Sequence, residues 1–147
     1  MDPLTRTAFS ATLHCFIGCA IGEVAGMAVA TALGWSNAHT IIISVLLAFI
    51  FGYAFSIRTM LGSGVGPARA VRLALAADTV SVTTMEIVDN ALILAIPGAI
   101  AAGLTDALFW LSLALSLALA FVAALPVNRW LISRGRGHAV MHAHHTA

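Results

Sequence analysis

The stretch LHCFIGCAIGEVAGMAVA, residues 13–30, decides the fold of this chain. It is almost wholly apolar, yet it contains two cysteines and a glutamate, and neither lysine nor arginine interrupts it. An apolar run of this length can cross roughly 30 Å of hydrocarbon as an α-helix. We therefore predict a transmembrane helix over residues 8–33 that places thiols and a carboxylate inside the membrane.

The composition extends this prediction to the whole chain. Of the 147 residues, 61% are hydrophobic and only 9% are charged. Soluble domains contain about 25% charged residues. A core this small cannot bury so much apolar surface, so lipid must be the solvent for much of it. The net charge of +1 and the scattered arginines also argue against a nucleic-acid partner.

Three further apolar segments have the length of a membrane span. The breaks between the four segments carry glycine, proline or tryptophan, as at Gly34-Trp35, Pro67 and Pro97-Gly98. We expect an all-α bundle of four transmembrane helices that forms one domain over residues 1–134, followed by a flexible His-rich cytoplasmic tail at 135–147. The predicted spans are residues 8–33, 40–57, 68–96 and 106–130.

The arginines predict the orientation of this bundle. They precede the first span, flank the connection between the second and third spans, and lie at or after the end of the fourth, whereas the other two connections have none. Because cytoplasmic loops are enriched in cations, both termini are expected in the cytoplasm and the protein in the inner membrane. The cations are Arg6, Arg58, Arg69, Arg72, Arg129, Arg134 and Arg136.

The first span divides into two neighbouring stripes when residues are placed at about 100° intervals. One stripe consists of side chains that can ligate a metal: Cys15, Cys19, Glu23 and Met27. The other stripe consists of His14 followed by small residues, which allow another helix to approach closely: Gly18, Gly22 and Gly26.

The third span carries a matching polar stripe. Its members fall within about 100° of one another on a helical projection. They are Asp78, Met85, Glu86 and Asp89, with Ser81 and Asn90 at the edges.

These acids are the most informative feature of the sequence. A carboxylate at the centre of a bilayer costs at least ~2.5–3.5 kcal/mol on insertion scales. Apart from Arg69, Arg72 and Arg129 near the span ends, no lysine or arginine lies within a predicted span to pair with one, and His14 is the only other base. The acids must therefore be protonated, hydrated or bound to a cation, and each state is typical of an ion or proton pathway. Neutral acids that hydrogen-bond between helices are the structural alternative.

The mixture of ligand types favours a transition metal. Thiols, thioethers and imidazoles suit copper(I), zinc and similar ions, whereas carboxylates alone suit calcium, magnesium or protons. We predict Asp78 and Asn90 on the ion or proton pathway, and a further metal-binding set in the tail at His142, His144 and His145. The predicted metal ligands within the membrane are His14, Cys15, Cys19, Glu23, Met27, Met85, Glu86 and Asp89.

The run LHCFIGCAIGE at residues 13–23, together with Asp78 and MEIVDN at 85–90, resembles the signature of an uncharacterised bacterial family of four-helix membrane proteins. The resemblance covers about residues 6–134. It implies an association with copper and heavy-metal handling, and so it favours copper over zinc or iron. It implies no particular mechanism.

The predicted function is therefore a membrane transporter, channel or binding protein for a transition metal, without enzymatic activity. One alternative is a proton-coupled transporter or channel whose carboxylates relay protons. A thiol–quinone oxidoreductase is disfavoured, because there is one cysteine pair and its i, i+4 spacing on a helix suits a disulfide poorly.

Four helices leave only a thin layer of protein around a pathway through the membrane. Several buried acids in so small a bundle favour a homodimer or larger homo-oligomer, with the glycine stripe as a candidate contact. A soluble metal chaperone is a further candidate partner.

Overall fold

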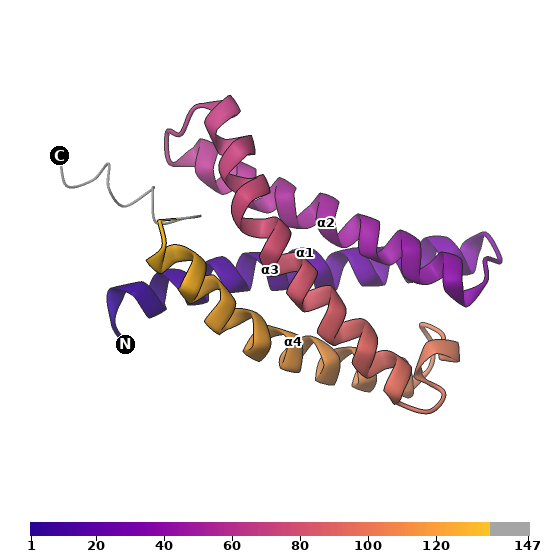
Figure 1. Ribbon diagram of the computed structural model, residues 1–147. Coiled ribbons are helices and arrows are strands. Elements are labelled where there is room, and N and C mark those ends of the chain that lie inside the picture. Colours follow the sequence, from indigo (N-terminus) through magenta and orange to yellow (C-terminus); the bar gives the residue numbers. More distant parts are fainter. Residues whose placement is uncertain (136–147) are drawn as a thin grey trace.

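The computed structural model describes residues 1–135, and within them the protein is all-α. The predicted metal-binding histidines of the tail and Arg136 lie outside the described residues. Four long helices alternate in direction, which confirms the predicted all-α class with four helices (Figure 1). They are α1 (Pro3–Ala32), α2 (Asn37–Gly62), α3 (Pro67–Ala95) and α4 (Ala107–Ser133), with a short 3-10 turn, η1 (Ala99–Ala101), before α4.

Local sequence explains where the helices begin and end. Asp2 caps α1, because its Oδ1 accepts a hydrogen bond from the backbone N–H of Thr5 at 2.7 Å. That bond, and a second from the Thr5 hydroxyl, hold the pKa of the Asp2 carboxyl below its ordinary value. Pro67 occupies the first position of α3, where its missing N–H costs nothing. After α3, Gly98 adopts φ +79°, a conformation that suits only glycine well.

Three helices of the described chain, α1, α2 and α4, are long and apolar enough to cross a membrane. Helix α3 has 29 residues, but two arginines in its first turns and three acids along one face make it less apolar. Its outer face is nevertheless hydrophobic. The exposed large side chains of this face are Val71, Leu75, Val80, Ile87 and Leu94.

The glycine stripe of α1 packs against α2 of the same chain. A Cβ added to Gly18 would lie 2.6 Å from the Cα of Gly52, and one added to Gly22 would overlap the backbone of Ala48. Gly26 faces Ser44 in the same way. The prediction that small residues permit close helix approach is thus confirmed. Their candidate role in contacts between copies was wrong, because α2 already covers them.

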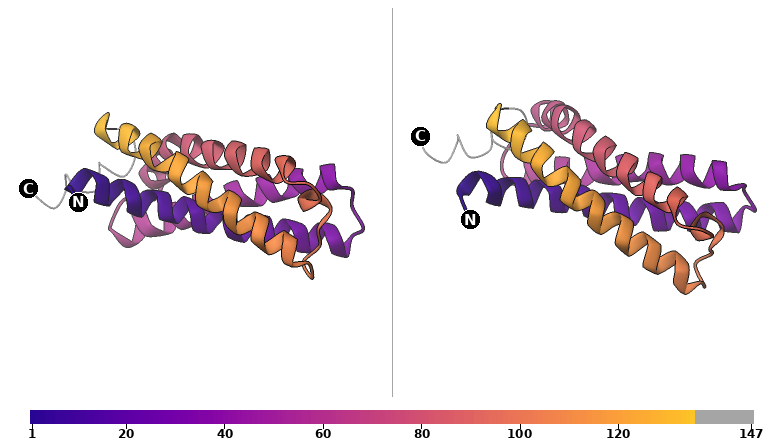
Figure 2. Two further views of the ribbon diagram at one scale, coloured as in Figure 1. Left: turned by 90° about the horizontal axis from the view of Figure 1, so that it is seen from below. Right: turned by 60° about the horizontal axis from the view of Figure 1, so that its bottom comes forward.

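The two ends of the bundle differ in charge. Figure 2 shows that the N-terminus, the α2–α3 connection and the last turns of α4 lie at one end. All six arginines among residues 1–135 lie in these segments or in the adjoining turns of α1, α2 and α3, and we call this the arginine end. The opposite end is formed by residues 33–36 and 96–106, which contain no arginine. Trp35 and Trp110 lie near this arginine-free end and are exposed.

Substitution at the α1–α2 contact gives a first prediction. Gly22→Ala should destabilise the protein by roughly 1–3 kcal/mol, because the added methyl overpacks two backbones that cannot separate locally. Gly62→Ala is the matched control, since a Cβ there meets open space. Unfolding of purified protein in mixed micelles measures both changes. Equal stabilities of the two variants would contradict the packing described here.

Candidate functional site

Polar side chains form a column through the interior of the bundle, mainly between α1 and α3. These two helices both start at the arginine end, so their polar stripes run in the same direction. Residues with polar side chains at most 6% exposed are Thr12, Ser56, Asp78, Ser81, Glu86, Asp89, Ser112, Ser116 and Asn128. Cys15 and Cys19 are buried among them as free thiols.

The level nearest the arginine end joins three helices. Asn128 of α4 donates hydrogen bonds from its Nδ2 to Thr12 Oγ1 at 2.8 Å and to Ser81 Oγ at 2.9 Å. Because the acceptors belong to α1 and α3, one amide ties α4 to both. Such bonds between membrane helices are worth up to about 1.7 kcal/mol each.

The same level also pairs a thiol with an acid. Cys15 donates from Sγ to Asp78 Oδ1 across 3.8 Å, and Asp78 is only 2% exposed. The second oxygen of Asp78, Oδ2, is buried beside the hydroxyl of Ser56 on α2, and neither atom has a partner in hydrogen-bond geometry.

One to two turns further on, the column contains two sulfur atoms. Cys19 Sγ of α1 lies 4.0 Å from Met85 Sδ of α3, and the side chains are 0% and 1% exposed. Glu86 lies beside Cys19. Its Oε2 accepts a hydrogen bond from Asn90 at 3.3 Å, whereas its Oε1 is buried without a partner.

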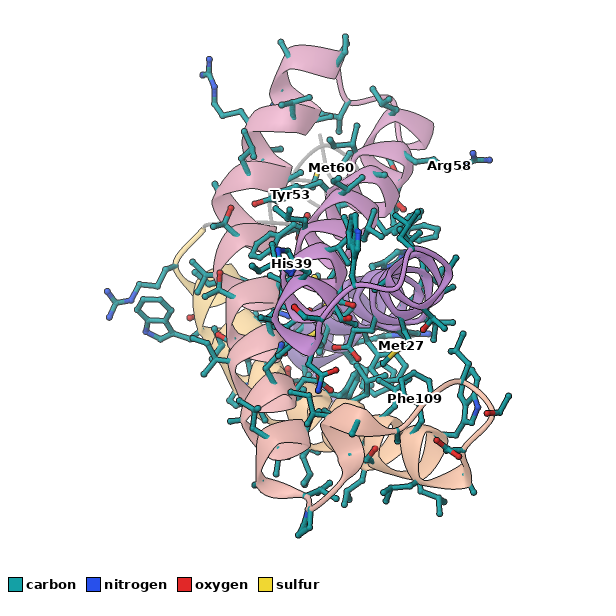
Figure 3. All side chains as sticks on the ribbon, turned by 90° about the vertical axis from the view of Figure 1, so that its right-hand side faces the viewer. Met27, His39, Tyr53, Arg58, Met60 and Phe109 are labelled. Atoms are coloured by element: carbon teal, nitrogen blue, oxygen red, sulfur yellow. The ribbon has the colours of Figure 1, made fainter. Side chains whose placement is uncertain are left out.

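Two acids line a cavity toward the arginine-free end. Glu23 and Asp89 both border a cavity of about 60 Å³, with Met27 and Asn90 also in its wall. Asp89 accepts a hydrogen bond from Ser116 of α4, whereas Glu23 Oε1 has no hydrogen-bond partner. Figure 3 looks at the bundle from this end and shows Met27 and Phe109, another residue of the cavity wall, in the space between α1 and α4.

A wider hollow of about 370 Å³ adjoins this cavity. It is bounded by the α1–α2 turn and by the connection that contains η1. Met27, Asn37, Thr40 and Ile100 belong to the walls of both spaces. The two spaces therefore lead from the arginine-free end to Glu23 and Asp89.

The structure brings the two predicted stripes together, with Cys15 near Asp78, Cys19 near Met85, and Glu23 on the same cavity as Asp89. It does not gather the predicted metal ligands at one point. In residues 1–135, no group of three or more histidine, cysteine, aspartate or glutamate side chains is placed to hold a metal ion. The ligand-type groups are instead distributed along the column in pairs.

His14 stands apart from these pairs. Its Nδ1 lies 2.7 Å from the carbonyl oxygen of Ser10 in the same helix, and the side chain is half-buried. A carbonyl only accepts, so Nδ1 is the donor of this hydrogen bond.

Sequence reasoning missed the contributions of α4 and α2. Asn128, Ser116 and Ser56 complete the column, yet none was among the predicted site residues. Asn128 offered a signal, since it is the only amide side chain in an otherwise apolar helix. The serines offered none, because hydroxyls commonly bond to their own helix.

The fold and the column define a helical membrane protein whose interior is lined with acids and thiols. The chain belongs to the family described as a domain of unknown function, DUF4396, which matches residues 5–137. This match confirms the predicted membership of an uncharacterised family, while the association with copper stays a prediction. No curated protein and no solved structure matches the chain.

Removal of the Asn128 amide gives a second prediction. Asn128→Ala should destabilise the bundle by roughly 1–3 kcal/mol, because two hydrogen bonds between helices are lost. Val122→Ala on the lipid-facing side of α4, which is 65% exposed, is the control. The two variants are compared by unfolding in mixed micelles. An Asn128 variant as stable as the control would mean that the amide does not tie the helices together.

Proposed function

We propose that this protein binds a transition-metal ion within the membrane and moves it along the polar column, with copper favoured and zinc or iron as alternatives. In this proposal all four helices cross the bilayer. Helix α3 can do so because its acids, Asp78, Glu86 and Asp89, face the interior and its exposed face past Arg72 carries no charged side chain.

One observation carries the proposal. Carboxylate oxygens of Glu23, Asp78 and Glu86 are buried without hydrogen-bond partners. No lysine or arginine occurs at residues 7–57 or 73–128, so the sequence places no strong base near the middle of the column. Unsatisfied acids in an apolar interior are costly, and a bound cation offsets that cost.

The shape of the interior supports a route. The wide hollow and the smaller cavity would admit an ion from the arginine-free end to Glu23 and Asp89. From there the sulfur pair and the Cys15–Asp78 pair continue toward the arginine end. By the distribution of cations, we place the arginine end in the cytoplasm and the protein in the inner membrane.

Proton conduction is the second candidate function, and specific contacts favour it. The Cys15 thiol donates to Asp78, and the Ser116 hydroxyl donates to Asp89, so groups that exchange protons are already hydrogen-bonded in the column. In that case protons move between the carboxyl groups, and the thiols only pack and donate hydrogen bonds, which serine hydroxyls could also do.

A third prediction tests the metal proposal. Full-length wild-type protein purified in detergent should retain a transition metal. The Cys15→Ser/Cys19→Ser variant should lose it, because soft ligands are replaced by hydroxyls. Elemental analysis per mole of protein is the measurement. Asp106→Asn is the control, since this acid lies before α4, outside the column, where it accepts a hydrogen bond from the backbone N–H of Gly103. Equally low metal in wild type and the double variant would refute a role for the thiols in metal binding.

Proteoliposomes separate the two candidate functions. If protons are the cargo, Glu86→Gln should abolish acid-driven proton flux, whereas the double serine variant should retain it. If a metal is the cargo, both variants should lose metal uptake into the vesicles.

A further inference from the structure

We infer, on the basis of the proposed function, that Cys19, Met85 and Glu86 form a binding site for a soft monovalent cation, such as the cuprous ion. The thiolate and the thioether would be the ligands, and Glu86 would take up the proton that the thiol gives up. This assignment names the charge of the cargo and the level of the column at which it is held.

The distance between the sulfur atoms suits an ion bound by both. Cys19 Sγ and Met85 Sδ are 4.0 Å apart. With metal–sulfur bonds of roughly 2.3 Å, as in zinc thiolates, this distance corresponds to a sulfur–metal–sulfur angle of about 120°. The two side chains come from different helices, so an ion between them would also join α1 to α3.

The Glu86 carboxyl supplies an independent observation at the same place. It is only 6% exposed, and its Oε1 has no hydrogen-bond partner. It lies beside the Cys19 thiol. The site therefore contains the Cys19 thiol of α1, which can give up a proton. It also contains two consecutive residues of α3, Met85 with a sulfur ligand and Glu86 with a buried oxygen that has no partner.

The charge of the ligands matches a monovalent ion once Glu86 has taken up the thiol proton. The sulfur pair lies in the apolar core with Ala48, Val82, Leu113 and Leu117, where net charge is costly. One thiolate and one neutral thioether exactly balance a single positive charge. A divalent ion would leave a charge of +1 unless Glu86 also stayed ionised. Sulfur ligands favour copper(I) among the transition metals for the same site.

Binding of the ion moves one proton from Cys19 to Glu86. A monovalent ion M⁺ meets the Cys19 thiol and the Glu86 carboxylate. The S–H bond breaks, the proton forms an O–H bond with Glu86, and a metal–sulfur bond forms at Cys19 while Met85 donates a lone pair. No electron is transferred, so the ion must arrive already in the monovalent state.

Anaerobic titration of the full-length protein in detergent with copper(I) or silver(I) against a chromophoric chelator tests this site. Cys19→Ser and Met85→Leu should each weaken binding by more than the roughly 10–100-fold that loss of an outer-shell partner costs. Met60→Leu is the matched control, because this methionine on α2 is fully buried but belongs to no pair of the column (Figure 3). X-ray absorption should show two sulfur neighbours in wild type and one in Met85→Leu.

The proton provides a second readout that does not depend on affinity. Glu86→Gln cannot accept the thiol proton, so it should release more protons to the solvent per ion bound than wild type does. Equal proton release by the two proteins would refute the role assigned to Glu86.

Different results would refute the sulfur site and the proposed function. Unchanged copper(I) and silver(I) affinity in Cys19→Ser and Met85→Leu would refute the sulfur site. If Glu23→Gln nevertheless abolishes metal uptake into proteoliposomes, the proposed function stands with another ion or site. If the wild-type protein neither binds nor takes up any transition-metal ion, both proposals fall.

Discussion

The arrangement of the helices depends on one constraint. Their carboxylic acids must be kept away from lipid, although the interior offers no lysine or arginine to pair with them. Helix α3 can lie against lipid only if its acids turn inward, and the large hydrophobic side chains on its exposed face are accordingly valine, leucine and isoleucine. The neighbouring helices then supply partners. Cys15 reaches Asp78 from α1, and Ser116 reaches Asp89 from α4. Where partners are missing, as at Glu86 Oε1, the interior keeps an unsatisfied acceptor that a proton or a cation can occupy.

The glycines of α1 make this arrangement possible. Because Gly18 and Gly22 allow α2 to approach until backbones touch, one side of α1 is fully occupied. The adjacent stripe, with Cys15 and Cys19, is then available to α3 and α4. Edge-to-face contacts of Phe121 with Phe9 and Phe16, at centroid distances of 5.3 and 5.7 Å, hold α4 against α1. The glycine stripe that packs against α2 and the stripe that carries the two thiols are therefore neighbouring sides of α1.

The column changes its chemistry along its length. Near the arginine-free end it is a cavity lined by the carboxyl groups of Glu23 and Asp89. In the middle it consists of the sulfur atoms of Cys19 and Met85, and near the arginine end it ends in hydrogen bonds made by Asn128. Oxygen ligands tolerate hydrated cations, whereas a dry sulfur pair selects soft ones. In the proposed function, an ion would lose its water before it meets the thiols.

The sequence by itself determined the helices and the faces they bury. Apolar length indicates a helix, and the 3.6-residue period places Cys15 with Cys19, and Asp78 with Glu86, without knowledge of any neighbour. Only the tertiary structure decided which stripe meets which helix. It gave the glycine stripe to α2, bonded His14 to Ser10, brought Asn128 to Thr12 and Ser81, and spread the ligands into pairs. The physical reason is that periodicity is local, whereas the choice of a partner helix depends on side-chain packing between segments far apart in the chain.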